Sequence, residues 1–186
     1  MSGKLRGTNM DRMPGWAFRI MSFMFDVTDL FRSPDRKLDP FDIRNGATVA
    51  DWGCGTGRFL KSASERVGPT GTVYAVDIHE LAIGAARRVM DKYRLGNVKP
   101  VQTDGKSVEI PSRSVDVIYA LDMFHMVSDP DTFLKELNRI IKPAGILYLE
   151  DGHQPRELSK QKIERSGCWK ILEESKEHLK CIPLPV

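Results

Sequence analysis

Acidic residues and glycines able to bind a polar ligand occur at three places in the first 105 residues. The segment Asp51-Trp-Gly-Cys-Gly-Thr-Gly57 joins a carboxylate to a glycine-rich turn. Asp77 follows 20 residues after Gly57, and Asp104 follows 27 residues after Asp77. A carboxylate can neutralise a cation, accept hydrogen bonds from both hydroxyls of a ribose, or accept a hydrogen bond from an exocyclic amine. With Ile78 available to pack on a purine face, these residues predict a pocket for a ribose, a purine and an amino-acid-like cation.

The spacing of the glycines excludes two common phosphate-binding loops. A dinucleotide fingerprint would need glycine at position 58, where this chain has Arg58, and no Lys-Ser/Thr pair of a P-loop follows. We therefore expect the loop to bring its backbone close to a ligand without cradling a pyrophosphate.

The pattern of apolar residues indicates how these groups are positioned. Short β-branched runs alternate with amphipathic segments, which is typical of an α/β fold with a parallel sheet. The expected strands are 48–52, 72–78, 98–103, 115–121 and 144–150, and the expected helices are 58–67, 80–94, 129–142 and 159–166. Two last runs, 169–173 and 178–184, predict an antiparallel hairpin. Because the carboxyl ends of parallel strands share one edge, the predicted ligand-binding residues should meet there.

Composition limits the class of protein. A chain of 186 residues, 41% hydrophobic and 28% charged, suits one domain with its own core. The net charge of +3 comes without a basic block, so no nucleic acid is expected as a partner. The three cysteines have no metal-ligand spacing and cannot all pair. Neither a signal peptide nor an apolar run of membrane-spanning length is present in the sequence given, which leads us to expect a cytoplasmic protein.

Residues 1–44 differ from the rest and are assigned as an N-terminal helical segment, with residues 45–186 as the ligand-binding domain. The segment holds five of the eight Met and five of the eight Phe, and positions 16–31 show helical spacing. A helix packed on the core, a mobile substrate lid and a peripheral membrane contact all remain open for residues 16–31.

The sequence resembles the class I S-adenosylmethionine-dependent methyltransferases, in the small type-11 branch that includes ubiquinone/menaquinone C-methyltransferase-like enzymes. The resemblance covers about residues 45–184, and five segments carry it: VADWGCGTGRF at 49–59, VYAVDIHE at 73–80, QTDG at 102–105, VDVIYALDMFHMVSDP at 115–130 and FLKELNRIIKPAGILYLED at 133–151. It implies a Rossmann-like, doubly wound seven-stranded sheet ordered 3-2-1-4-5-7-6, with strand 7 antiparallel.

The same resemblance implies the cofactor, S-adenosyl-L-methionine, with S-adenosyl-L-homocysteine as product. It assigns the cofactor's contacts by position: the methionine part to Asp51, Gly53, Cys54, Gly55 and Gly57, the ribose to Asp77, the adenine to Ile78, Asp104 and Gly105, and the sulfonium side to Ala120 and Leu121. Trp52 departs from the small or aliphatic residue that is usual in the family, and we expect it to affect packing only.

The transfer itself is expected to be an in-line displacement onto a small or medium-sized acceptor. A base is needed only if the attacking atom carries a proton. His125, in the loop after the fourth strand, is the first candidate to contact the acceptor, with Asp122 beside it; the other candidates follow the fifth strand and are Glu150, Asp151 and His153. No metal is expected, because Glu150-Asp-Gly-His153 replaces the Asp-Asn pair of metal-dependent catechol-type enzymes.

Two further questions stay open at this level. A non-catalytic module that binds the cofactor and serves as a partner or regulatory subunit would keep the same motifs, since a cofactor site does not prove chemistry. The acceptor side has little chain available to it, so residues 16–31, a large substrate or a second copy of the chain in a homodimer must complete it.

Overall fold

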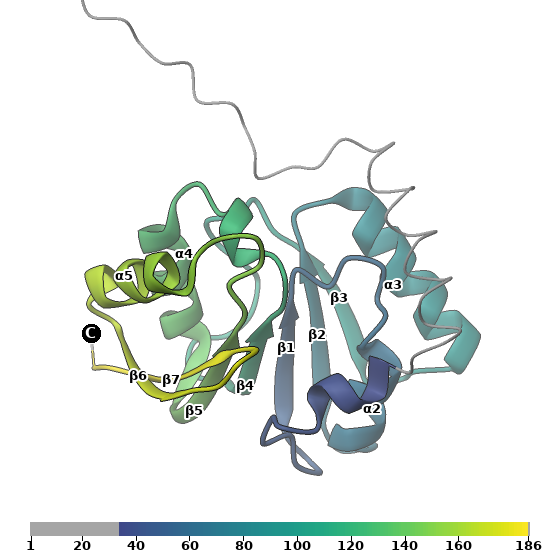
Figure 1. Ribbon diagram of the computed structural model, residues 1–186. Helices are drawn as coiled ribbons and strands as arrows, with labels where there is room; N and C mark the ends of the chain where they lie inside the picture. The colour runs from purple at the N-terminus through teal and green to yellow at the C-terminus, as the bar shows by residue number, and fades with distance from the viewer. Residues whose placement is uncertain (1–33, 186) are drawn as a thin grey trace, which may run out of the picture.

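The computed structural model describes residues 34–185, which form a mixed sheet with helices on both faces (Figure 1). Two 3-10 helices are η1 (Pro34–Leu38) and η2 (Phe124–Met126). The α-helices are α2 (Leu60–Val67), α3 (Glu80–Tyr93), α4 (Pro130–Ile140) and α5 (Arg156–Ser166). The strands are β1 (Thr48–Trp52), β2 (Thr72–Asp77), β3 (Val98–Gln102), β4 (Val115–Ala120), β5 (Ile141–Leu149), β6 (Trp169–Glu174) and β7 (Leu179–Pro183).

The sheet has the predicted topology. Its seven strands run in the order β3-β2-β1-β4-β5-β7-β6, and β7 pairs antiparallel with both β5 and β6. The predicted hairpin is therefore confirmed, and β3 lies at one edge of the sheet. The direction of strand order reverses between β1 and β4, where doubly wound folds bind their ligands.

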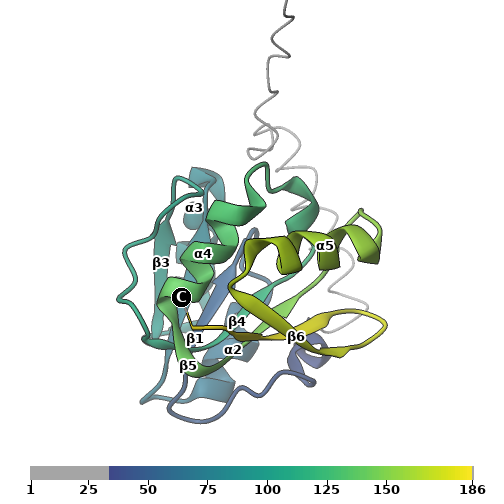
Figure 2. The same ribbon diagram turned by 90° about the vertical axis from the view of Figure 1, so that its left-hand side faces the viewer.

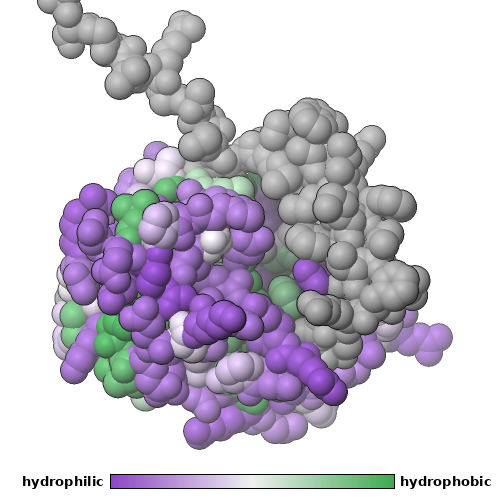
Figure 3. All heavy atoms as spheres, viewed as in Figure 1, coloured by the Kyte–Doolittle hydropathy of each residue, from purple (hydrophilic) through white to green (hydrophobic). Residues whose placement is uncertain are grey.

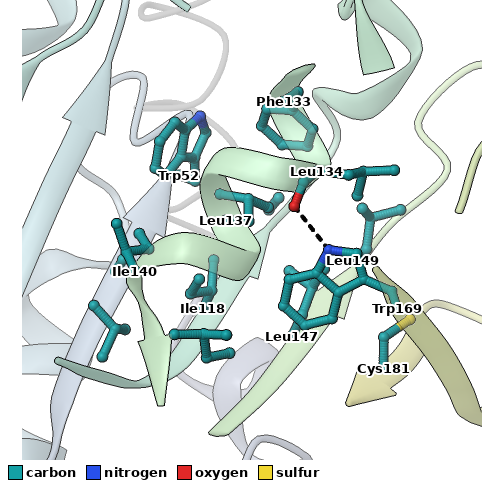
Figure 4. Packing of buried hydrophobic residues seen from close by; sticks show 14 of the residues in the cluster. Trp52, Ile118, Phe133, Leu134, Leu137, Ile140, Leu147, Leu149, Trp169 and Cys181 are labelled. Atoms are coloured by element: carbon teal, nitrogen blue, oxygen red, sulfur yellow. Dashed lines mark hydrogen bonds between the residues drawn. The ribbon is translucent and has the colours of Figure 1, made fainter. Parts of the chain in front are cut away.

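Alternate residues of the strands supply two cores, one on each face of the sheet. Ala50, Ile118 and Leu147 pack on the face covered by α4 and α5, where Trp169 donates an indole hydrogen bond of 2.9 Å to the Leu134 carbonyl (Figure 4). Figure 2 shows α4 and α5 together in front of this face. Because both faces are covered, the strands can be apolar throughout, as the sequence indicated.

The other face packs against α2, α3 and the chain that precedes β1. Leu38 and Phe41 are buried there, and the Phe41 ring stacks on Tyr148 with 4.3 Å between centroids. Leu38 and Phe41 thus contribute to the core of the domain, although the sequence assigned them to the N-terminal segment. The predicted helix over 16–31 and its lid role lie outside the described residues.

Several element bounds differ from the predictions. The helix after the glycine loop begins at Leu60 instead of 58, because its N-cap residue Phe59 offers no side-chain cap and the turn of residues 54–57 comes first. The last helix begins at Arg156 instead of 159, after Pro155. The fifth strand begins at Ile141 instead of 144, since Ile141 pairs with Val115 before an irregularity in the register.

On the face drawn in Figure 3, most of the described surface is hydrophilic and apolar residues form small separate patches. The exposed large apolar side chains within the described chain are Tyr93, Leu158, Leu172 and Leu184. None of the helices described is long and apolar enough to cross a membrane. All three cysteines are free and buried.

Candidate functional site

The loop after β1 folds back onto the end of β2. The backbone N–H groups of Gly53 and Cys54 both donate to the Val76 carbonyl, at 2.8 and 3.0 Å. Gly53 has φ +81°, and a Cβ on it would lie 2.9 Å from Cγ of Met123. This position therefore requires glycine for its backbone conformation and for the close approach of the β4 loop.

Gly57 has a different task from Gly53. A Cβ at Gly57 would lie 3.0 Å from Leu60 and 3.3 Å from Val89, so the missing side chain lets the turn pack on α2 and α3.

Asp77 at the end of β2 joins this loop to the start of α3. Its Oδ2 accepts the Gly55 N–H at 3.0 Å, and its Oδ1 accepts the His79 N–H at 2.8 Å. His79 in turn caps α3 by accepting the Leu81 N–H. Burial raises the pKa of Asp77, and the backbone N–H donors oppose that rise. Each carboxylate oxygen has a second lone pair, which leaves both free to accept ligand hydroxyls.

Asp51 at the end of β1 is the most buried acidic group of the site, at 2% exposed. Its Oδ2 has no hydrogen-bond partner among the described residues. Burial raises the pKa of Asp51 to about 8, and the Tyr119 hydroxyl acts in the opposite direction. A buried carboxyl oxygen without a partner costs free energy, so this position favours a ligand that donates to it.

A cavity of about 710 Å³ lies where these strand ends meet. Its size falls within the usual range for ligand pockets. Most of the predicted cofactor residues line it, together with the catalytic candidate Asp122: Asp51, Gly53, Cys54, Gly55, Asp77, Ile78, Asp104, Gly105, Leu121 and Asp122. Three predicted site residues are not part of its lining: Gly57, Ala120 and His125.

The residues that the sequence predicts to contact the adenine, Ile78, Asp104 and Gly105, all line the cavity. Asp104 is exposed, and its Oδ1 accepts the N–H groups of Lys106 and Ser107 at 2.8 and 2.9 Å. The Ser107 and Lys106 donors lower the pKa of Asp104, which keeps it ionised at neutral pH. Gly105 has φ +86°, and a Cβ there would touch Ile78 at 3.7 Å.

Trp52 and Ala120 both belong to the core beneath the cavity. Trp52 packs edge-on against Phe133, 5.8 Å between centroids, and also lines the cavity. Its effect is therefore not limited to the packing that the sequence suggested. Ala120 is fully buried and its carbonyl accepts the Glu150 N–H at 3.0 Å, so it joins β4 to the end of β5.

The two catalytic candidates occupy different places in the loop after β4. Asp122 lines the cavity, has φ +52°, and lies 3.9 Å from Nε2 of His153. His125 instead packs against Gly152, and its ring centroid lies 4.9 Å from that of His153. Burial lowers the pKa of His125, so its imidazole is neutral at pH 7. The structure thus brings Asp122, but not His125, to the cavity wall.

The cavity lining also contains an ion-pair cluster whose contacts the sequence did not predict. Nζ of Lys37 lies 2.5 Å from Oε1 of Glu150 and 2.8 Å from Oε2 of Glu177. All three residues line the cavity. Lys37 and Glu177 are 140 positions apart, so no local pattern announces their contact.

Apolar side chains also line the cavity. Phe59, Met123 and Met126 line the cavity together with Leu121. The two methionines belong to the segment 115–130, which carries the family resemblance. The sequence therefore placed this segment near the ligand but did not predict that these two side chains line the cavity. Within residues 34–185, no three His, Cys, Asp or Glu side chains are grouped so that they could hold a metal ion.

Comparison with known proteins identifies this arrangement. A family model described as a methyltransferase domain matches residues 50–149, and the chain belongs to that family. The ubiquinone/menaquinone biosynthesis C-methyltransferase of Saccharophagus degradans is 31% identical over 131 residues, which are 70% of this chain and 53% of the relative. The nocamycin O-methyltransferase of Saccharothrix syringae is 33% identical over 135 residues, 71% of this chain and 48% of the relative. The chain therefore spans about half the length of these curated relatives.

A solved structure agrees over nearly its full length. The S-adenosylmethionine-dependent methyltransferase of Aquifex aeolicus superimposes with a TM-score of 0.77 at 26% identity, covering 92% of this chain and 98% of that one. The resemblance to class I methyltransferases seen in the sequence is thereby confirmed, and S-adenosylmethionine is the cofactor that this family implies.

The described residues fit that cofactor. The unpartnered carboxyl oxygen of Asp51 matches an ammonium group, and the Asp77 oxygens can accept ribose hydroxyls. Gly53, with no side chain, keeps the loop clear where a Cβ would meet Met123. Ile78 and Gly105 leave a shallow apolar surface for a purine.

Proposed function

We propose that this protein transfers the sulfonium methyl group of S-adenosylmethionine to a small or medium-sized acceptor. The observation that carries the proposal is one continuous cavity, in which the unpartnered Asp51 and the Asp77 carboxylate share a wall with Asp122 and an apolar compartment. S-adenosylmethionine, when bound, supplies a methyl group that its sulfonium makes electrophilic.

The protein's residues then have two tasks, to orient and to exclude water. Asp51 would hold the methionine part of the cofactor and Asp77 its ribose, on either side of the sulfonium, and the loop after β4 lines the same cavity. Phe59, Leu121 and Met123 line the adjoining wall and leave few polar groups for water to bind. Alignment of two reacting groups can supply roughly 7–11 kcal/mol of a barrier, which is enough to make positioning the main contribution.

Asp122 is our candidate for the group that contacts the acceptor and accepts its proton where the attacking atom carries one. It lies at the cavity wall in the left-handed region of backbone space, a conformation that Asp tolerates better than most residues. His125, the first candidate from the sequence, does not contact the acceptor in this proposal. It packs against Gly152 and His153 instead.

The acceptor class follows from the lining and from the relatives. The curated relatives are named as a C-methyltransferase and an O-methyltransferase, which makes enolic and phenolic acceptors the first to test. The proposal includes no nucleic-acid substrate. A homodimer that completes the acceptor compartment, and a cytoplasmic location, remain predictions from the sequence.

The test is methyl transfer from labelled S-adenosylmethionine to a panel of quinols, phenols, amines and thiols. Transfer to a member of the panel, lost in Asp122→Asn while cofactor binding persists, is the expected result. Cofactor binding at micromolar concentration without transfer to any acceptor would contradict the proposal and favour the non-catalytic module instead.

A further inference from the structure

Asp51 and Tyr119 form a buried polar pair beneath the cofactor cavity. They are paired in register on the neighbouring parallel strands β1 and β4, which puts their side chains side by side on one face of the sheet. Tyr119 is fully buried. Oδ2 of Asp51 and the hydroxyl oxygen of Tyr119 both lack a regular hydrogen-bond partner among the described residues.

The surroundings of this pair are mostly apolar or acidic. The rings of Phe41 and Phe59 lie 5.8 and 6.5 Å from the Tyr119 ring, measured between centroids. From β2, Asp77 faces Asp51 with the same charge, and from the loop the Cys54 thiol lies within electrostatic reach. Burial raises the pKa of the Tyr119 hydroxyl, and the positive charge of the Arg66 guanidinium on α2 opposes that rise. The positive charge that would balance an ionised Asp51 is therefore best supplied by a ligand.

We propose that Asp51 is protonated in the cofactor-free protein and releases this proton when the α-ammonium group of S-adenosylmethionine binds, with Tyr119 as the positioning residue that holds the resulting carboxylate. The proposal rests on the proposed function for the identity of the ligand. The O–H bond of Asp51 breaks and the proton leaves to solvent, while an N–H···O⁻ bond from the ammonium forms. Nothing is oxidised or reduced.

Burial is the physical reason for this order of events. It raises the pKa of Asp51 to about 8 while the cavity holds no cation, and the like charge of Asp77 adds to the rise. An ammonium group at hydrogen-bond distance favours the charged carboxylate and reverses that shift. Below pH 8 the protein must therefore lose a proton to bind, and affinity should rise by up to roughly tenfold per pH unit between pH 5.5 and 7.5. A free α-amino group itself titrates at about 7.7–8.0, so the affinity should pass through a maximum near pH 8 and fall at higher pH, where the ligand must take up a proton to bind as an ammonium.

The test is calorimetry of cofactor binding at pH 6.5 in two buffers with different enthalpies of ionisation. The difference in observed heat gives the number of protons released. We expect close to one for the wild-type protein and close to none for Asp51→Asn. Binding by the wild-type protein without proton release would overturn the proposal, and would leave methyl transfer as a separate question.

Binding of S-adenosylhomocysteine shows which charge of the ligand causes the proton release, because this compound carries the ammonium group but no sulfonium. The expected result is the same proton release with both ligands. Release with S-adenosylmethionine alone would overturn the assignment to the ammonium group.

Tyr119→Phe tests the positioning role, and Tyr148→Phe is its matched control. Tyr148 pairs with Tyr119 in register on β5, but its hydroxyl contacts Asp42, not Asp51. Loss of the Tyr119 hydroxyl should weaken binding several-fold at pH 6.5 and move the affinity maximum to higher pH, whereas Tyr148→Phe should leave the pH profile unchanged. Identical profiles for the two variants would remove Tyr119 from the proposal.

A measurement on the wild-type protein tests the ionisation of Asp51 without relying on variants, which could fail to fold. Isotope-edited infrared difference spectra should show the loss of a protonated carboxyl band when the cofactor binds. An unchanged carboxyl region would contradict the proposed ionisation.

Discussion

The two ends of the cavity are built in opposite ways. The end that we propose for the cofactor uses residues at the ends of adjacent strands, with Asp51 on β1 and Asp77 on β2 next to a glycine loop. The end that we propose for the acceptor joins distant segments, since Lys37 from η1 contacts Glu150 after β5 and Glu177 before β7. The first depends on local backbone geometry, and the second depends on the complete fold.

Their electrostatics differ as well. Asp51 is buried with an unpartnered oxygen, whereas Glu150 is already ion-paired, with its side chain 13% exposed. An uncompensated buried acid favours binding of a cation, but a paired one mainly holds its neighbours in place. We therefore expect substitutions at the cofactor end to change cofactor affinity, and substitutions at the acceptor end to change turnover or stability without changing that affinity.

The largest expected effect is on turnover, from Asp122→Asn. If Asp122 accepts a proton from the acceptor, kcat should fall by about 100-fold or more, the usual size of general-base effects. Asparagine tolerates the positive φ of this position, so the loop should keep its shape. His125→Ala is the comparison and should change kcat by less than about threefold, since His125 lies off the cavity wall. Initial rates with saturating cofactor measure both, and equal losses in the two variants would contradict the assignment.

Gly53→Ala should weaken cofactor binding by about 10- to 100-fold. A non-glycine residue in the left-handed region costs about 1–2 kcal/mol, and the new Cβ would also press on Met123. Gly96→Ala is the matched control, because a Cβ there meets nothing within 4 Å. Titration calorimetry compares the two variants, and unimpaired binding by Gly53→Ala would show that the loop geometry does not set the affinity.

The pH dependence of stability separates Asp51 from the paired acids. Its pKa is raised from 3.8 to about 8 in the folded protein, so the folded state binds more protons than the unfolded state across that window. This contribution to stability is complete below about pH 4 and is lost as pH rises through 8. Between pH 6 and 8 the free energy of unfolding of the cofactor-free protein should fall by about 1–2 kcal/mol relative to Asp51→Asn. Denaturant titrations of both proteins measure the difference, and parallel pH profiles would be inconsistent with a buried protonated Asp51.

The smallest effects are expected from the ion-pair cluster. Double-mutant cycles should give a coupling of about 1 kcal/mol for Lys37–Glu150 and about 0.3 kcal/mol for Lys37–Glu177. The order follows from exposure, since the Glu150 side chain is 13% exposed and the Glu177 side chain 64%. Cofactor affinity should stay unchanged in all of these variants. A loss of affinity comparable to that of Gly53→Ala would erase the distinction between the two ends.

The same contrast explains what could be predicted from the sequence. The glycine loop, Asp77 and Asp104 follow strands directly, so periodicity and motif spacing were enough to bring them to one edge of the sheet. The sheet order came from the family resemblance. Lys37 and Glu177 could not be found in this way, because their contact exists only after β7 has paired between β5 and β6. The position of His125 also escaped prediction, since its packing against Gly152 depends on how two separate loops meet.

The central claim is that this cavity binds S-adenosylmethionine through Asp51 and Asp77, and direct calorimetric titration tests it. We predict one binding site per chain for the wild-type protein. Binding should weaken by about 100-fold or more in Asp77→Ala, because two backbone N–H groups and the ribose hydroxyls lose their acceptor together. Undiminished binding by a folded Asp77→Ala protein would contradict the assignment of the site.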